Sequence, residues 1–114
     1  MDIFFWFVDL SIPVTMLVIG LVFIKFPPRK INNLYGYRTK RSMSNEGTWK
    51  LAHLKCGQIW IKVGIVLLIA VLLSKLYVPV KKEILSLIHI GIGIMCLFIP
   101  LPFVESALKK YLKE

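Results

Sequence analysis

Three long apolar runs constrain the fold of this chain more than any other feature. They cover about residues 4–24, 57–77 and 84–103. Each approaches the roughly 20 residues that a helix needs to cross about 30 Å of hydrocarbon. Backbone polar groups cannot stay unpaired in lipid, so such runs cross the bilayer as helices. We therefore predict an all-α integral membrane protein, with residues 1–114 forming a single membrane domain of three transmembrane helices.

The first run is predicted to be a retained span rather than a cleaved signal peptide. Asp2 stands where a signal peptide would carry basic residues. The run ends at Lys25, Pro27 and Pro28, without the small residues of a cleavage site.

The basic residues predict the orientation. The chain has a formal net charge of +9. Eleven basic residues lie between the first two runs or after the third, whereas the opposite side has only Lys75, at the end of the second run, and Lys81 and Lys82. The positive-inside rule then places the N-terminus outside and the long loop and C-terminus in the cytoplasm. We expect a bilayer with anionic head groups as the partner of this charge, and no nucleic acid.

Prolines and polar residues predict where the helices begin and end. Pro27 and Pro28 should end the first helix. Ser44 is predicted to cap the second, with Glu46 in its first turn, and nothing interrupts that helix before Pro79.

Two further sets of residues should shape the helices. Pro13 is predicted to kink the first helix, and Pro100 and Pro102 to bend the third. Gly64, Gly91 and Gly93 should allow close helix approach, but no Gly-x-x-x-Gly motif specifies a dimer, so an oligomer remains open.

The polar insert, about residues 29–55, is predicted to be a structured cytoplasmic element. Two interpretations of it are open. In one, Arg38 pairs with Glu46 or Glu105 and the insert is only a clamp. In the other, it forms a pocket for an anionic head group or a partner protein. The candidate binding residues are Asn32, Tyr35, Tyr37, Arg38, Thr39, Ser42, Trp49 and His53.

One stripe of the second helix carries Trp49, His53, Cys56 and Trp60, at helical spacing. The two tryptophans fit an aromatic belt at the head-group level, and Trp49 and His53 alternatively line the insert pocket.

Two ionisable residues inside the apolar runs are predicted to pair. Asp9 and His89 each lie about five residues in from the outer end of their helix, so their depths match to within a turn. Intramembrane ionisable groups usually face the bundle interior and pair with one another. Ser86 and Lys75 should lie nearby. The pair is either an interhelical clasp or part of an outward-facing notch that recognises something arriving from outside.

No complete catalytic set and no cofactor motif is visible in the chain. Cys56 and Cys96 should differ in depth by roughly 10 Å, too far for a disulfide. No metal-ligand spacing, carboxylate pair or nucleophile–base set is visible. We therefore expect no catalytic residues, no metal and no cofactor.

The segment from Ile31 to Trp49 resembles the signature of the SdpI family of bacterial membrane proteins. Its Tyr-Gly-Tyr-Arg-Thr core follows an Asn and precedes serines and a Trp on a helix. The family tends to have Asn or Gln where this chain has His53. The resemblance implies a bacterial plasma-membrane protein that gives immunity to a secreted antimicrobial peptide toxin and holds a cytoplasmic repressor. The best-known member is longer, and this chain resembles its C-terminal unit.

Three classes of function follow from these features. The first is an immunity or peptide-resistance protein that binds without chemistry of its own. The second is a small membrane enzyme or binding protein acting on an anionic lipid head group, with His53 as base and Arg38 as anion clamp. The third is a transporter subunit, which would need more spans to surround a path. The first class fits the sequence best.

Overall fold

The protein is a bundle of α-helices in this computed structural model, which describes residues 2–32 and 34–113. The helices are α1 (Asp2–Lys25), α2 (Glu46–Tyr77), α3 (Lys82–Leu97) and α4 (Pro100–Leu112). Three helical segments of the described chain are long and apolar enough to cross a membrane, and α3 and α4 together form the third. The predicted fold class is confirmed.

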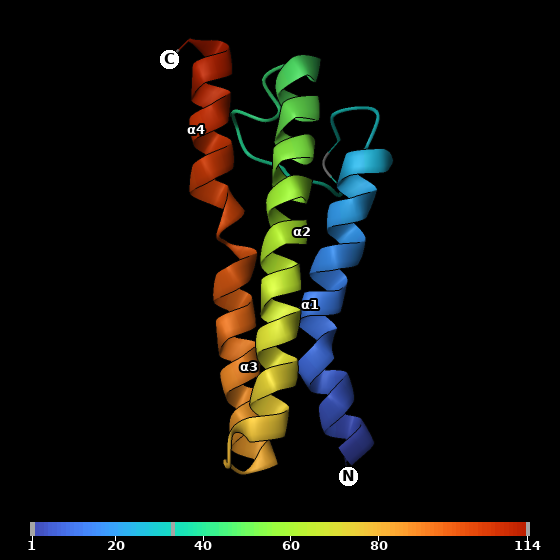
Figure 1. Ribbon diagram of the computed structural model, residues 1–114. Helices are drawn as coiled ribbons and strands as arrows, with labels where there is room; N and C mark the ends of the chain where they lie inside the picture. Colours follow the sequence, from blue (N-terminus) through green and yellow to red (C-terminus); the bar gives the residue numbers. More distant parts are fainter. Residues whose placement is uncertain (1, 33, 114) are drawn as a thin grey trace.

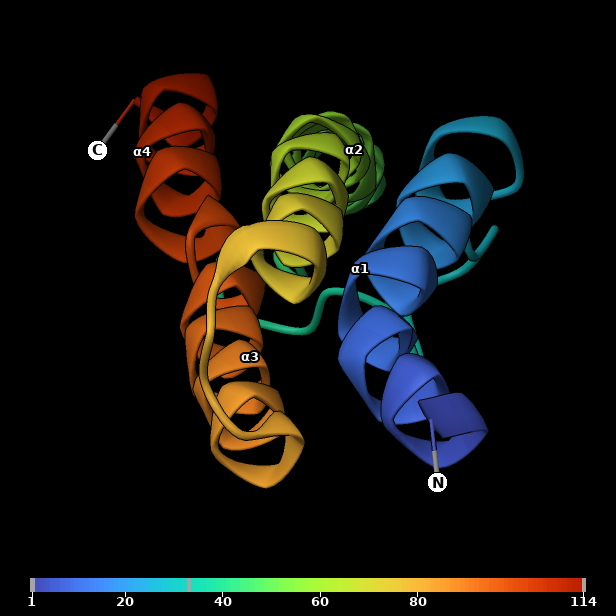
Figure 2. The same ribbon diagram turned by 60° about the horizontal axis from the view of Figure 1, so that its bottom comes forward.

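Helix α2 lies at the centre of the bundle (Figure 1). It packs against α1, α3 and α4, and α1 also packs against α3. In Figure 2, α4 and α1 lie on opposite sides of α2. The N-terminus and the α2–α3 loop share one end of the bundle, here called the hairpin end. The segment between α1 and α2 and the C-terminus share the other, here called the insert end.

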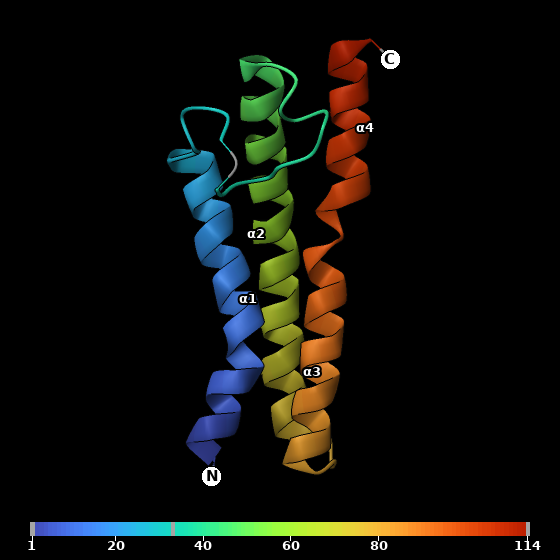
Figure 3. The same ribbon diagram turned by 180° about the vertical axis from the view of Figure 1, so that it is seen from behind.

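The length of α2 explains how it serves both ends. Its 32 residues span about 48 Å at 1.5 Å per residue, well beyond about 30 Å of hydrocarbon. The surplus turns lie beside the insert, which crosses α2 from the end of α1 toward α4 (Figure 3).

The cap of α2 differs from the prediction. Asn45, not Ser44, is the N-cap: its side chain accepts from Thr48 N at 2.9 Å, and Thr48 Oγ1 accepts from Asn45 N at 3.1 Å. Ser44 Oγ instead donates to the Lys40 carbonyl, 3.0 Å away, because residues 39–43 already form a turn. Glu46 lies in the first turn, as predicted.

The prolines predicted to bend the third helix accompany a full break in it. Helix α3 ends at Leu97, and α4 begins at Pro100 after two non-helical residues. Helix α1 continues through Pro13, which is buried.

The closest approach of α1 and α2 involves glycines that the sequence did not single out. A Cβ added to Gly57 would lie 2.6 Å from the Gly20 carbonyl oxygen, so the two backbones touch there. Gly64 and Gly93 each lie against a side chain of α1, as predicted. Gly91 faces open space, so the prediction of a close approach there is wrong.

Candidate functional site

The insert is fastened to the bundle by a group of buried polar and aromatic side chains at the insert end. Trp49 and His53 of α2 are 1% and 0% exposed. Trp49 Nε1 donates to the Pro28 carbonyl at 2.8 Å. The centres of the Trp49 and His53 rings lie 4.5 Å apart. Trp49 therefore does not belong to a lipid-facing belt. Trp60 is also directed inward, because its Nε1 donates to the Leu97 carbonyl at 3.1 Å.

His53 holds the turn of the insert through its ring nitrogens. Nε2 accepts from the backbone N–H of Tyr37 at 2.9 Å, and Nδ1 lies 2.7 Å from the Trp49 carbonyl. An N–H donor on one nitrogen and a carbonyl on the other fit only the neutral ring with its proton on Nδ1. The amide oxygen of an Asn or Gln side chain could accept the same N–H bond.

Glu105 of α4 is the acid on which the insert docks. Its Oε2 accepts from Tyr37 Oη at 2.7 Å and from Thr39 Oγ1 at 3.0 Å. Arg41 Nη1 lies 3.3 Å from Oε1. Burial, together with the Glu105 carboxylate, raises the pKa of the Tyr37 phenol above its ordinary range, so Tyr37 remains a neutral donor.

Ser42 stabilises the turn at residues 39–43 through its buried side chain. Its fully buried hydroxyl donates to carbonyls of the turn and accepts from Thr39 N at 2.8 Å. Five of the eight predicted binding residues thus lie in or against one packed core, namely Tyr37, Thr39, Ser42, Trp49 and His53.

The other three predicted residues lie outside this core. Asn32 Oδ1 accepts from Leu34 N and Tyr35 N, both at 2.9 Å, and so forms a local turn. Tyr35 is 58% exposed and Arg38 is exposed. Glu105 joins the insert to the bundle. From the sequence alone it is expected only as a possible partner for Arg38.

Removing the Glu105 carboxylate should release the insert. We expect Glu105→Ala to cost about 2 kcal/mol, the usual range for lost hydrogen bonds to a charged group. Trypsin should then cut faster after Lys40 and Arg41 in detergent-solubilised protein. Ser106→Ala, at the exposed neighbouring position, is the control. Equal digestion of the two variants would show that Glu105 does not hold the insert.

A second polar group lies between the helices near the hairpin end. Asp9 Oδ1 lies 2.8 Å from His89 Nδ1, and Asp9 Oδ2 accepts from Lys75 Nζ. His89 Nε2 lies 2.7 Å from Ser74 Oγ. The Asp9, His89 and Lys75 side chains are 1%, 7% and 10% exposed, so the pair expected from matching depths is buried. Ser86 is also buried nearby.

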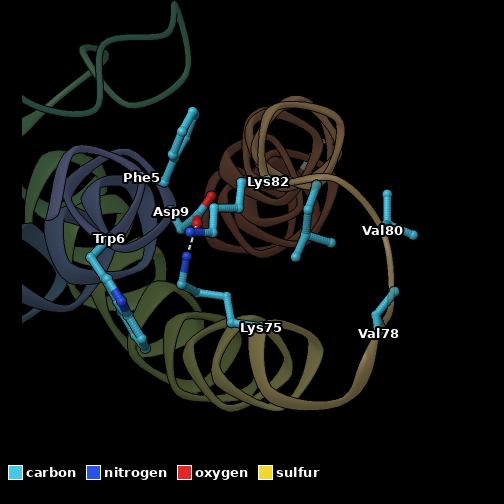
Figure 4. Close-up of a pocket in the computed structure, with 8 residues that line it drawn as sticks. Phe5, Trp6, Asp9, Lys75, Val78, Val80 and Lys82 are labelled. Atoms are coloured by element: carbon cyan, nitrogen blue, oxygen red, sulfur yellow. Dashed lines mark hydrogen bonds and ion pairs between the residues drawn. The ribbon is translucent and has the colours of Figure 1, made fainter. Parts of the chain in front are cut away.

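A cavity of about 240 Å³ opens onto this group. Figure 4 shows the Lys75 and Lys82 side chains both extending toward the Asp9 carboxylate. Lys75 Nζ also lies 4.5 Å from the centre of the Trp6 ring. The complete lining is Phe5, Trp6, Asp9, Lys75, Val78, Val80, Lys82 and Leu85.

A helical bundle with a buried ionisable group and a docked polar insert defines the class: a multi-pass membrane protein with polar sites at both ends. The model of the SdpI/YfhL protein family matches residues 29–104, and the chain belongs to that family. Glu105 lies one residue beyond the matched region.

One curated relative is similar to part of this chain. The "Uncharacterized protein YfhL" of Bacillus subtilis (strain 168) is 40% identical over 52 residues, which cover 46% of this chain and 47% of that protein. The match thus covers about half the length of each. No solved structure matches the chain.

Proposed function

We propose that this protein confers immunity to a secreted antimicrobial peptide by binding it at the membrane. Membership of the SdpI/YfhL family supports the proposal, together with the three membrane-spanning segments. The observation that carries it is the cavity above Asp9, which combines charged, aromatic and apolar side chains at the hairpin end of the bundle.

The proposed orientation places that cavity outside the cell. Eleven basic residues belong to the insert end or the start of α2, against three at the hairpin end. With the basic end in the cytoplasm, a secreted peptide would meet the cavity first. Labelling of Ser44→Cys by a membrane-impermeant reagent in intact cells would contradict this orientation.

The chemistry of the cavity suits a peptide carboxylate. Asp9 is already engaged by Lys75 and His89, and Lys82 adds a second ammonium group directed at the same point. Cations therefore outnumber the carboxylate. Phe5 and Trp6 provide apolar walls for neighbouring peptide side chains. A C-terminal carboxylate or an acidic side chain would bind the lysines in this partly desolvated setting.

A survival assay in a toxin-sensitive bacterial host tests the proposal. The unaltered protein should raise the peptide concentration that inhibits growth. At equal membrane level, Lys82→Ser should lower that concentration about tenfold, because a charged contact of this kind is typically worth 1.5–3 kcal/mol.

Lys81→Ser is the matched control. It removes the same charge one residue away, at an exposed position outside the cavity lining, and should protect as well as the unaltered protein. Failure of the unaltered protein to protect against any of a panel of secreted peptides would refute the proposed function.

A further inference from the structure

A second cavity, at the insert end, is basic and belongs to neither polar group described above. It is open and measures about 830 Å³. Three segments contribute its cations: Lys25 ends α1, Arg29 lies in the insert, and Lys50 lies in the second turn of α2. The remaining lining residues are Phe26, Pro27, Pro28 and Tyr35.

The charge of this cavity is not balanced within the described chain. Lys25, Arg29 and Lys50 are exposed, and none of them has an ion pair among residues 2–32 and 34–113. No carboxylate lines the cavity. Glu46 lies one helical turn before Lys50, yet the two form no ion pair in the structure. A concave surface with three cations and no acid concentrates anions.

The wall of the cavity is fixed by the buried core of the insert. Pro28 is buried, and its carbonyl accepts the indole N–H of Trp49 at 2.8 Å. Asn32 holds the backbone of Tyr35 through its side-chain oxygen, at 2.9 Å. Two consecutive prolines further restrict the backbone between Lys25 and Arg29. The cations therefore project from backbone positions that are set before any ligand arrives, which lowers the cost of binding.

The level of the cavity along the bundle indicates what the anion is attached to. Lys25 is the last residue of the apolar helix α1, where the hydrocarbon should end and the head groups begin. Phe26 and Tyr35, 75% and 58% exposed, add aromatic surface at the same level. Aromatic rings beside cations at this depth are typical of contacts with lipid head groups.

We propose that the cavity formed by Lys25, Arg29, Lys50 and Tyr35 binds the phosphodiester of an anionic membrane lipid such as phosphatidylglycerol. Arg29 provides a planar fork of donors for two phosphate oxygens, and the lysines neutralise the remaining charge. The core of the insert then has a task beyond fastening the loop: it holds the wall of a lipid site. This proposal does not depend on the function proposed above.

Lipid binding by the purified protein in a neutral detergent tests the proposal. Short-chain phosphatidylglycerol is titrated in, and bound lipid is counted by native mass spectrometry, with phosphatidylcholine of the same chain length in parallel. We expect saturable binding of phosphatidylglycerol only. The triple variant Lys25→Gln, Arg29→Gln, Lys50→Gln should bind it about a hundredfold more weakly, since each cation that lines the cavity contributes a factor of roughly five.

The matched control is Lys109→Gln, Lys110→Gln, Lys113→Gln. It removes three exposed charges from the last turn and the C-cap of α4, at the same end of the bundle and outside the cavity. It should bind within about threefold of the unaltered protein, because these charges lie outside the cavity and salt screens their attraction for the lipid. Lys50→Gln alone should weaken binding about fivefold, which provides a second measurement if the triple variant folds poorly.

Two results would overturn the proposal. Equal weakening in both triple variants would mean that diffuse charge, not the cavity, attracts the lipid. Competition by glycerol 3-phosphate at the same concentration as the lipid would assign the site to a soluble phosphate ester instead.

Discussion

Asp9→Asn is expected to destabilise the bundle by about 3–5 kcal/mol, the usual cost of removing one partner from a buried ion pair. The substitution keeps the size of the side chain but leaves Lys75 charged, 10% exposed and without its carboxylate. The amide has one acceptor oxygen where the carboxylate had two, so its NH2 group must face either Lys75 or the Nδ1 of His89. The midpoint of unfolding by a denaturing detergent should fall accordingly.

A double substitution shows whether an unpaired charge is the cause. Asp9→Asn with Lys75→Met removes both charges, so it should be more stable than Asp9→Asn alone. Ser11→Ala is the control on the same helix, because Ser11 is exposed and its hydroxyl bonds only to the Val8 carbonyl one turn earlier. A double variant less stable than the single one would mean that Lys75 does more for the bundle than pair with Asp9.

Gly36→Ala should disrupt the insert. Gly36 has a φ of 109°, a backbone conformation that residues with a side chain rarely adopt. A Cβ there would lie 2.6 Å from His53 Nε2. That nitrogen already accepts the Tyr37 N–H, so the new methyl group must displace either the ring or the turn. We expect a loss on the order of 3 kcal/mol, from backbone strain together with a broken buried hydrogen bond.

Gly91→Ala makes the same chemical change without these consequences. Gly91 is helical, and a Cβ there would meet nothing within 4 Å. Alanine should leave the stability unchanged or raise it by up to about 1 kcal/mol. Thermal unfolding in detergent compares the two variants. Similar midpoints would show that the insert tolerates a side chain at Gly36, and that its packing on His53 is loose.

Much of the fold follows from local sequence. The three apolar runs and the breakers beside them place α1 and α2, because bilayer thickness and the missing proline N–H act on each segment by itself. The pairing of Asp9 with His89 also follows, since two buried ionisable groups at one depth in neighbouring helices have few other partners.

The site at the insert is less completely predictable. Trp49 and His53 stand out by helical spacing, and both lie in the packed core. Spacing alone does not set the direction in which they point. Trp49 is expected in a lipid-facing belt, but it points inward and donates a hydrogen bond to the Pro28 carbonyl. Asn45 rather than Ser44 caps α2, because the Ser44 hydroxyl already bonds within the preceding turn. That bond is not visible in the sequence.

The sequence by itself determined the membrane class, the number of spans and the presence of a polar pair within them, because hydropathy, length and charge are properties of single segments. Only the tertiary structure decided that Glu105 receives the insert, that Gly20 meets Gly57, and that Lys25, Arg29 and Lys50 surround one cavity. These contacts join residues distant in the chain. They depend on how far each helix is rotated about its own axis. Each helix is apolar and exposed to lipid on most sides, so its sequence does not specify that rotation.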